Sequence, residues 1–441
     1  MALTSIYPNH WQEERVAAGF TTPEALASAA SLDPEWFRHI ESGEILPTLA
    51  ELDRLVAALG DIPRERLYQF GLVNTIGGTQ PADHPPDYAK FYGARVEIEH
   101  LFVSKDEIAW LEKDETPDRT VDVFVNMSCG PMEVPHLLLN TVSVFDTLGV
   151  NYQAGAGRIV CCGTYYRGNR NTDAGYRMHD ASVGRSVAWG AKTTVHWCTQ
   201  CQNTFNEVAR RRELAATDEP RLRNVQLLSF LEERLLALGD RVPWKKRVAA
   251  RVMVQGSDVS PVHAAAKRKV ADVLRLVPGV TVVGFTDLPD GQGKDAPRTA
   301  EGVRAKRAEL AEIARRMGAD TLSPQHHNGQ KFWSRFSSET VAVRHTISIL
   351  AEALGCERPD RYQAAHLLGD PDAVVAQLRP VWSTWGMTEE KAGLLARELF
   401  SPAYAAGPSR CTCGSETGCR EGLISVDVLQ GSVRRPASAA H

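Results

Sequence analysis

The sequence predicts a bundle of short helices at the N-terminus, followed by a duplicated α/β unit with parallel strands. Short amphipathic segments, two of which start with proline after a capping residue, occupy residues 10–70. From residue 121 onward, apolar strand-like runs alternate with segments of helical periodicity, as in a parallel sheet. The same order recurs about 130 residues later, which indicates an internal repeat.

Length and composition fit a globular protein of two or three domains. The chain has 441 residues, of which 43% are apolar and 24% charged, and its formal net charge is −4. A chain of this length is too long to fold around a single hydrophobic core. We find no apolar run of about 18 residues and no basic-then-apolar N-terminus. We therefore expect no membrane contact and a cytoplasmic location.

Residues 1–72 are expected to form the helical bundle. Thr22 and Asp33 can each cap a helix whose first residue is proline, and Gly43 and Gly60 end the third and fourth helices. The third helix places Phe37 three residues before Ile40, so both lie on one apolar face.

Two short helices with a tight turn between them, the second ending Ile40-Glu41-Ser42-Gly43 with Pro47 beyond it, resemble the Cro-like (XRE) helix-turn-helix family. The resemblance covers about residues 11–67 and also includes Arg15, Gly19, Leu26 and Leu32. It implies that the helix from Asp33 to Ser42 lies in a DNA major groove. The side chains it places at DNA are Thr22, Asp33, Glu35, Trp36, Arg38 and His39.

The charge of this module leaves two interpretations open. Residues 1–73 contain five arginines, no lysine and eleven carboxylates, a net charge of −6. Phosphate neutralisation usually supplies most of the affinity for DNA. The module is therefore either a DNA reader that binds as a homodimer, or a helix-turn-helix that contacts protein.

Residues 73–118 read as a linker and lead-in. Residues 73–92 are rich in Gly, Pro, Asp and Asn without periodicity, as interdomain linkers are. Residues 93–118 have a mixed pattern that leads into the next domain.

The first copy of the α/β unit is expected in residues 119–215 and the second in residues 250–358, joined by a charged helix over 222–238 within residues 216–249. In the first copy we expect strands over 121–127, 158–160 and 192–196, and helices over 134–148, 174–189 and 200–212. In the second we expect strands over 251–257, 280–285 and 320–325, and helices over 262–276, 299–317 and 338–354. Positions 121, 150 and 192 map to 251, 280 and 320, which gives offsets of 130, 130 and 128 residues.

Residues 359–400 read as a helical appendage, and residues 401–441 as a mobile tail rich in Ser, Gly, Ala and Pro. The tail carries Cys411, Cys413 and Cys419. Three thiols without a clear fourth ligand make, at most, a second thiol site of structural or labile kind.

Five of the nine cysteines lie in one stretch of the first copy: Cys129, Cys161, Cys162, Cys198 and Cys201. Thirty-one residues separate the first from the adjacent pair, thirty-five separate that pair from the third group, and two lie inside the CxxC. Each group follows a predicted strand, and the carboxyl ends of parallel strands share one edge of a sheet. Five thiols exceed the ligand number of a tetrahedral zinc site or an ordinary cubane cluster.

This pattern resembles the cysteine-rich CCG domain of the heterodisulfide reductase catalytic subunit, which also occurs in glycerol-3-phosphate and lactate oxidation proteins. The resemblance covers about residues 119–358, with the motif intact in the first copy only; Gly291-Gln292-Gly293 falls at the CCG position of the second. It implies one non-cubane [4Fe–4S] cluster held by all five cysteines. Because the second copy has lost its motif, the two-cluster disulfide chemistry of that reductase is not implied.

Zinc, bound by four of the five thiols, is the alternative to an iron–sulfur cluster. Histidines near the same sheet edge are His136, His179, His196, His263, His326 and His327, and Tyr165 and Tyr166 also lie there. If the repeat is symmetric, His326 and His327 face the cysteines, and they are the candidates for a catalytic or proton-transfer role.

Two functions follow from these features. The first is an XRE-type transcriptional regulator whose cysteine-rich domain senses redox state, a small thiol or disulfide, or iron supply. The second is a thiol–disulfide or electron-transfer enzyme related to the reductase, with the helix-turn-helix as a protein-docking module. The domain order favours the first function and the acidic N-terminus favours the second.

Overall fold

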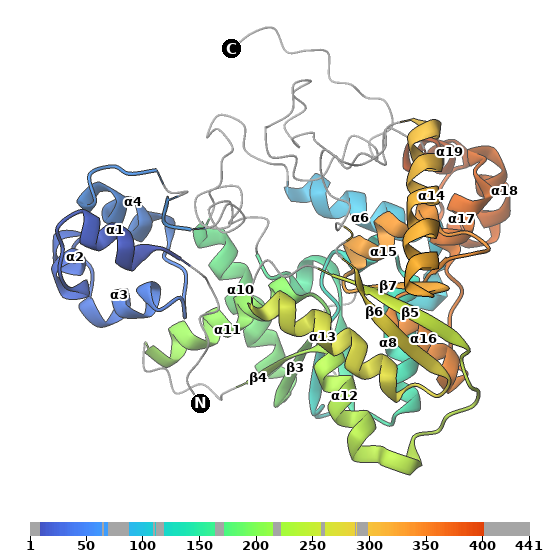
Figure 1. The fold of residues 1–441 in the computed structure, drawn as a ribbon, viewed down its shortest axis with the longest axis horizontal. Helices are drawn as coiled ribbons and strands as arrows, with labels where there is room; N and C mark the ends of the chain where they lie inside the picture. Colours follow the sequence, from blue (N-terminus) through green and yellow to red (C-terminus); the bar gives the residue numbers. More distant parts are fainter. Residues whose placement is uncertain are drawn as a thin grey trace, which may run out of the picture.

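Parallel strands form two four-stranded sheets in the computed structural model of the protein (Figure 1). The structure describes residues 9–63, 66–68, 88–108, 111, 119–163, 172–214, 222–256, 261–286, 288 and 299–400. Helices surround both sheets, so the expected combination of helices and parallel α/β units is confirmed.

The first sheet has the strand order β2-β1-β3-β4. Its strands are β1 (Val123–Asn126), β2 (Tyr152–Gly155), β3 (Thr193–His196) and β4 (Arg223–Gln226). The central strand β1 is buried along its whole length. Asn126, the last residue of β1, pairs with Gly155 on one side and with His196 on the other.

The second sheet has the corresponding order β6-β5-β7-β8. Its strands are β5 (Ala250–Gln255), β6 (Val280–Thr286), β7 (Thr321–Pro324) and β8 (Ala342–Val343). Gln255, the last residue of β5, pairs with Thr286 and with Pro324. Gln255 therefore occupies in this sheet the place that Asn126 occupies in the first.

Helices of the two halves pack on each other in a reciprocal way. The helix after β1, α8 (His136–Thr147), packs on α16 (Thr346–Leu354), which follows β8. The helix after β5, α13 (Pro261–Leu276), packs on α12 (Leu227–Leu238), which follows β4. These contacts place both halves around one large apolar core.

The remaining helices cover the sheets or extend from them. They are α6 (Tyr88–Phe102), α7 (Lys105–Ile108), α10 (Thr172–Ala188), α11 (Thr199–Leu214), α14 (Ala300–Met317), α15 (His327–Trp333), α17 (Arg361–Leu368), α18 (Pro371–Trp382) and α19 (Glu389–Leu399). Helix α14 ends at Gly318, whose φ of 66° is the left-handed conformation that glycine adopts without strain. Helices α18 and α19 pack on α6, so the expected helical appendage is attached to the lead-in segment.

Residues 9–63 contain four helices with a core of their own: α1 (Trp11–Ala17), α2 (Pro23–Ala29), α3 (Pro34–Glu41) and α4 (Leu49–Ala58). Thr22 and Asp33 accept hydrogen bonds at the starts of α2 and α3, and Thr48 with Glu51 forms a capping box on α4. The indole N–H of Trp11 donates to the hydroxyl of Tyr68 at 2.7 Å, and both side chains are buried.

Several expected elements were wrong in place or type. Residues 158–160 belong to the 3₁₀ turn η4 (Gly157–Val160), and the strand lies earlier, at β2. The connecting helix begins only at Leu227, because residues 223–226 pair as the edge strand β4. Residues 338–354 likewise contain the short strand β8 before α16. The linker does not reach residue 92, because α6 begins at Tyr88.

Some sequence features lie outside the described residues. These are Tyr165, Tyr166, Gly291 to Gly293, Cys411, Cys413 and Cys419. Within the described part of the chain, none of the helices has the length and apolar character needed to span a membrane.

The contact between α8 and α16 provides a test of how the two halves are joined. Asn140 of α8 is fully buried; its amide donates to the hydroxyl of Ser348 at 3.0 Å and accepts from the backbone N–H of Arg358 at 2.7 Å. Replacing Asn140 by alanine removes both hydrogen bonds and leaves the buried hydroxyl of Ser348 without this partner, so we expect Asn140→Ala to lower the free energy of unfolding by about 2 kcal/mol. Urea denaturation followed by circular dichroism measures this change.

The exposed Gln377 of α18 is the matched control, because Gln377→Ala also removes an amide from a helix. We expect its effect to stay within about 0.5 kcal/mol. Equal effects of the two substitutions would show that the Asn140 contacts do not hold the halves together.

Candidate metal and thiol site

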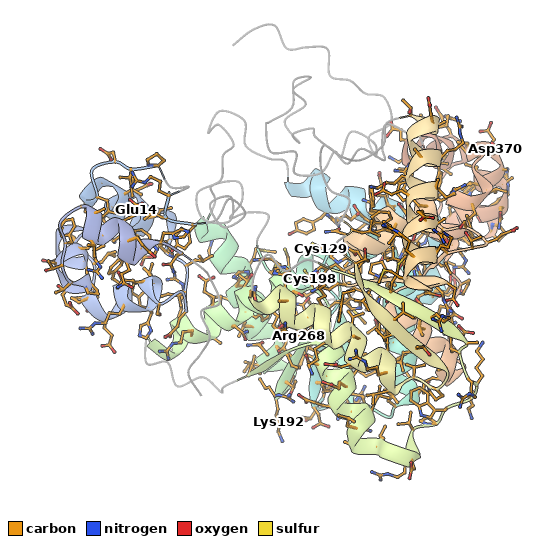
Figure 2. All side chains as sticks on the ribbon, viewed as in Figure 1. Glu14, Cys129, Lys192, Cys198, Arg268 and Asp370 are labelled. Carbon is orange, nitrogen blue, oxygen red and sulfur yellow. The ribbon has the colours of Figure 1, made fainter. Side chains whose placement is uncertain are left out.

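The five cysteines of the first copy meet at the carboxyl edge of the first sheet. Cys129 follows β1, Cys161 and Cys162 follow the η4 turn after β2, and Cys198 follows β3. Cys201 lies in the first turn of α11. Figure 2 labels Cys129 and Cys198 near the centre of the molecule. The expected gathering at one sheet edge is therefore present.

One buried residue, Asn126, fixes all three cysteine loops. Its side-chain amide donates to the carbonyl of Val160 at 3.1 Å and accepts from the backbone N–H of Ser128 at 2.9 Å. Its main-chain carbonyl accepts from the N–H of Trp197 at 3.0 Å. Val160, Ser128 and Trp197 each immediately precede a cysteine. A single fully buried residue thus connects the segments that carry the thiols, through its side chain and its main-chain carbonyl.

The thiols interact in a continuous series. Cys161 interacts with Cys129 and Cys162, and Cys201 with Cys162 and Cys198. The interaction with Cys129 raises the pKa of Cys161 well above its usual value, and that with Cys162 does the same for Cys201. The hydrogen bond with Cys161 lowers the pKa of Cys129, and Arg95 acts in the same direction. Metal coordination deprotonates such thiols.

Helix α6 supplies polar groups that sequence reasoning did not assign to the site. The hydroxyl of Tyr92 donates to the sulfur of Cys161 at 2.7 Å, and the guanidinium of Arg95 donates to the carbonyl of Cys129 at 3.2 Å. The backbone N–H of Gly163 also donates to the sulfur of Cys161, at 3.3 Å. Donors of this kind stabilise a thiolate or a cluster sulfide. No sequence signal links α6 to cysteines that lie tens of residues away.

A buried group of charges lies beside Cys129. Glu133 is 3.5 Å from Arg95 and 2.5 Å from Lys331 of α15, between their side-chain nitrogen and oxygen atoms. Burial opposes ionisation of Glu133, but the two cations outweigh it and lower its pKa to about 2. The group therefore holds two positive charges against one negative charge at the edge of the thiol site.

His327 of the second copy lies against the Cys129 loop, as the symmetry of the repeat predicts. A Cβ on Gly130 would overlap the imidazole of His327, so the loop passes the ring at a position where only glycine fits. His327 is 7% exposed, and its Nδ1 has no hydrogen-bond partner among the described residues. Burial lowers the pKa of His327 well below its usual value, and His326 and Arg95 add to this effect.

The other histidines lie in different surroundings. His326 lies near His263, with ring centroids 5.6 Å apart, and His345, which sequence reasoning missed, lies 4.7 Å from the ring of Trp197. His179 and His196 pack on Phe205. Nδ1 of His136 lies 3.2 Å from a carboxylate oxygen of Asp360.

The predicted DNA-contact residues do not form one free surface. Thr22 and Asp33 are used as helix caps, and Arg38 pairs with Glu24 at 2.5 Å. Nδ1 of His39 lies 2.9 Å from Glu44, and Trp36 lies under the guanidinium of Arg211. Glu35 is exposed.

The spacing of the thiols bears on which metal group these residues could hold. Within the described ranges, no three His, Cys, Asp or Glu side chains are spaced as ligands of one metal ion. A cluster differs, because each iron takes its own thiolate and the sulfur atoms need not converge on one point. The donor set of five thiols, with N–H and O–H donors directed at Cys161, matches that requirement.

The close approach at Gly130 predicts the outcome of a small substitution. Gly130→Ala forces the His327 ring or the Cys129 loop to move, so we expect a loss of about 1–3 kcal/mol in the free energy of unfolding. Removing the ring in Gly130→Ala/His327→Ala should restore part of that stability, and a double-mutant cycle in urea measures the coupling.

Gly184 in α10 is the control for that substitution, because nothing lies within 4 Å of a Cβ built there. Gly184→Ala should be neutral or stabilising, since alanine is the better helix former. Absence of coupling between positions 130 and 327 would contradict the contact.

The burial of His345 predicts that the free energy of unfolding depends on pH. Burial lowers its pKa from 6.5 to about 3, so the unfolded chain binds a proton that the folded chain does not. The stability supplied by the neutral ring is complete above pH 6.5 and is lost as the pH falls, by about 1.4 kcal/mol per unit down to the folded pKa. Nδ1 of His345 also accepts from the N–H of Ile347 at 3.2 Å, which caps α16.

Asparagine keeps a capping acceptor and does not titrate. We therefore expect the stability difference between the wild type and His345→Asn to shift in favour of the variant by about 2 kcal/mol between pH 7.5 and pH 5. Chemical denaturation at both pH values tests this, and an unchanged difference would show that His345 titrates normally.

Comparison with known proteins gives little further information. No family model matches the chain, and no curated protein matches it. Among solved structures, the crystal structure of a hypothetical protein from Helicobacter pylori is similar, with 14% sequence identity and a TM-score of 0.35. The similarity covers 59% of this chain and 55% of that protein, so this chain spans about half of its length. A TM-score of this size does not establish a shared fold.

Proposed function

We propose that the chain is a DNA-binding regulator whose cysteine-rich domain holds one iron–sulfur cluster. Through this cluster the domain would respond to redox state, to a small thiol or disulfide, or to iron supply. The observation that carries the proposal is the meeting of five thiols at one sheet edge, in a chain that also has four short helices at its N-terminus, three of them capped by a side chain. A cluster changes its charge or occupancy with redox state and iron supply.

Cys129, Cys161, Cys162, Cys198 and Cys201 would hold the cluster, which supplies an oxidisable group when bound. Tyr92, Gly163 and Arg95 would stabilise its negative charge through donated hydrogen bonds and a nearby cation. Helix α3 would read the DNA in the manner of helix-turn-helix proteins, as a homodimer that supplies two half-site contacts. Zinc remains the alternative occupant, with four thiolates as ligands.

An enzymatic function is the second candidate, and one observation favours it. The buried His327 has an unpartnered Nδ1 within the described structure and lies against the loop of Cys129. A thiol–disulfide or electron-transfer reaction at the cysteines would have a proton acceptor at that position.

Metal content and DNA binding test the first candidate together. Anaerobic purification should give a brown protein with about four irons per chain. Cys162→Ser should lose most of this iron, because Cys162 interacts with both Cys161 and Cys201. DNA from beside its own gene should then bind with different affinity in the loaded and the metal-free protein, measured at low salt.

Cys356→Ser is the matched control, since Cys356 is a half-buried thiol distant in sequence from the five. This variant should keep the iron and the wild-type DNA affinity. A colourless protein with one zinc would contradict the cluster, and failure of both forms to bind DNA would leave the enzymatic candidate.

A further inference from the structure

Helix α11 connects the thiol site to the N-terminal domain. Cys198 directly precedes the helix and Cys201 lies in its first turn, whereas Arg210 and Arg211 lie near its other end. Its sixteen residues span about 24 Å. Figure 1 shows the far end of α11 beside α3. One rigid element thus reaches from the cysteines to the helix expected to read DNA.

Two arginines make the contact at the far end. Nε of Arg210 donates to Glu44 at 3.0 Å, and a second nitrogen of Arg210 lies 3.4 Å from Nδ1 of His39. Arg211 donates to the carbonyl of Leu46. Hydrogen bonds from His39 and Arg210 outweigh the effect of burial and lower the pKa of Glu44, which therefore stays ionised.

Arg211 also covers an aromatic ring of α3. Its guanidinium carbon lies 4.9 Å from the ring centroid of Trp36, and the indole nitrogen of Trp36 is buried. The nitrogen of Arg211 that donates to Leu46 is also 3.8 Å from a carboxylate oxygen of Glu51 of α4. The cation–π contact and the ion pairs are only partly exposed to water, so they are screened less than surface pairs.

These contacts show which side of α3 faces the core of the N-terminal domain and which side faces α11. Phe37 and Ile40 face the core of the N-terminal domain, and Trp36 and His39 face α11. Over residues 33–42, the exposed residues are Asp33, Glu35, Arg38 and Ser42, and Arg38 is paired with Glu24. A helix that enters a major groove must present one full face to the bases. With α11 on the side of Trp36 and His39, α3 cannot present these two side chains to the bases, so the expected reading face is incomplete.

We infer that α11 holds the N-terminal domain in a closed position that excludes DNA, and that release of Arg210 and Arg211 is the step that exposes α3. This inference rests on the proposed DNA-binding function. Because α11 starts at Cys198 and Cys201, a change at the thiols acts on the helix that makes the closing contact.

Charge reversal on α11 tests the inference without altering the N-terminal domain. Arg210→Glu/Arg211→Glu places carboxylates against Glu44 and Glu51. We expect small-angle X-ray scattering of the full chain to show a larger radius of gyration, and hydrogen exchange to increase over residues 34–51. DNA should bind about tenfold more tightly at low salt, although the added negative charge alone would weaken binding.

Arg315→Glu/Arg316→Glu is the matched control, because these adjacent arginines of α14 are exposed and pair only with Glu312 among the described residues. It changes the net charge equally and should not tighten DNA binding. Arg211 also pairs with the buried Glu207, so the double variant risks misfolding. The single variant Arg210→Glu keeps that pair, and Arg315→Glu is its control.

The outcomes separate the inference from the proposed function. If the α11 variants and the wild type bind DNA equally, or the variants bind more weakly than the control, DNA binding stands and the closed position is wrong. If the variants open the molecule but no form binds DNA, the proposed DNA-binding function fails and the inference fails with it. Tighter binding by the variants alone supports both.

Discussion

The hydrogen bonds of Asn126 are the constraint on which the site depends. A parallel sheet brings the ends of β1, β2 and β3 to one edge, but it does not by itself fix the loops that follow them. The buried amide holds the Cys129 and Cys161 loops together, and the carbonyl of the same residue holds the segment before Cys198. Because an unpaired buried amide is costly, the loops have little freedom to separate.

The second half of the chain keeps this scaffold without the thiols. The side chain of Gln255 donates to the carbonyl of Leu288 at 3.0 Å, and its main-chain carbonyl accepts from the N–H of Gln325. These bonds reproduce those of Asn126 to Val160 and Trp197. In this half, His326 stands where Cys198 stands in the first and starts α15 in the same way. The duplicated frame therefore places His326 and His327 where the first half places a CxxC, and His327 lies against the opposite cysteine loop.

Much of the α/β fold was predictable from the sequence, and the features that were not predicted have physical reasons. Strands β1, β3, β5 and β7 are short, mostly buried runs, and their residue pattern predicts strands. Strands β4 and β8 were missed because edge strands of a few residues merge into the helices that follow. The meeting of the five cysteines was predictable because it needs only parallel strands of known order. Tyr92, Arg95 and the docking of α3 on α11 were not, because they depend on how separate elements pack.

The C-terminal helices have a consequence for how the chain can be divided. The ring of His100 stacks on Trp385 at 3.5 Å, the indole of Trp385 donates to the carbonyl of Val103, and Lys391 pairs with Glu97. Helix α6, which touches two of the cysteine loops, is therefore covered by residues nearly three hundred positions later in the chain. A fragment that keeps both α6 and its cover must run from residue 88 to residue 400: a cut before residue 119 would remove α6, and a cut after residue 358 would remove the helices that cover it.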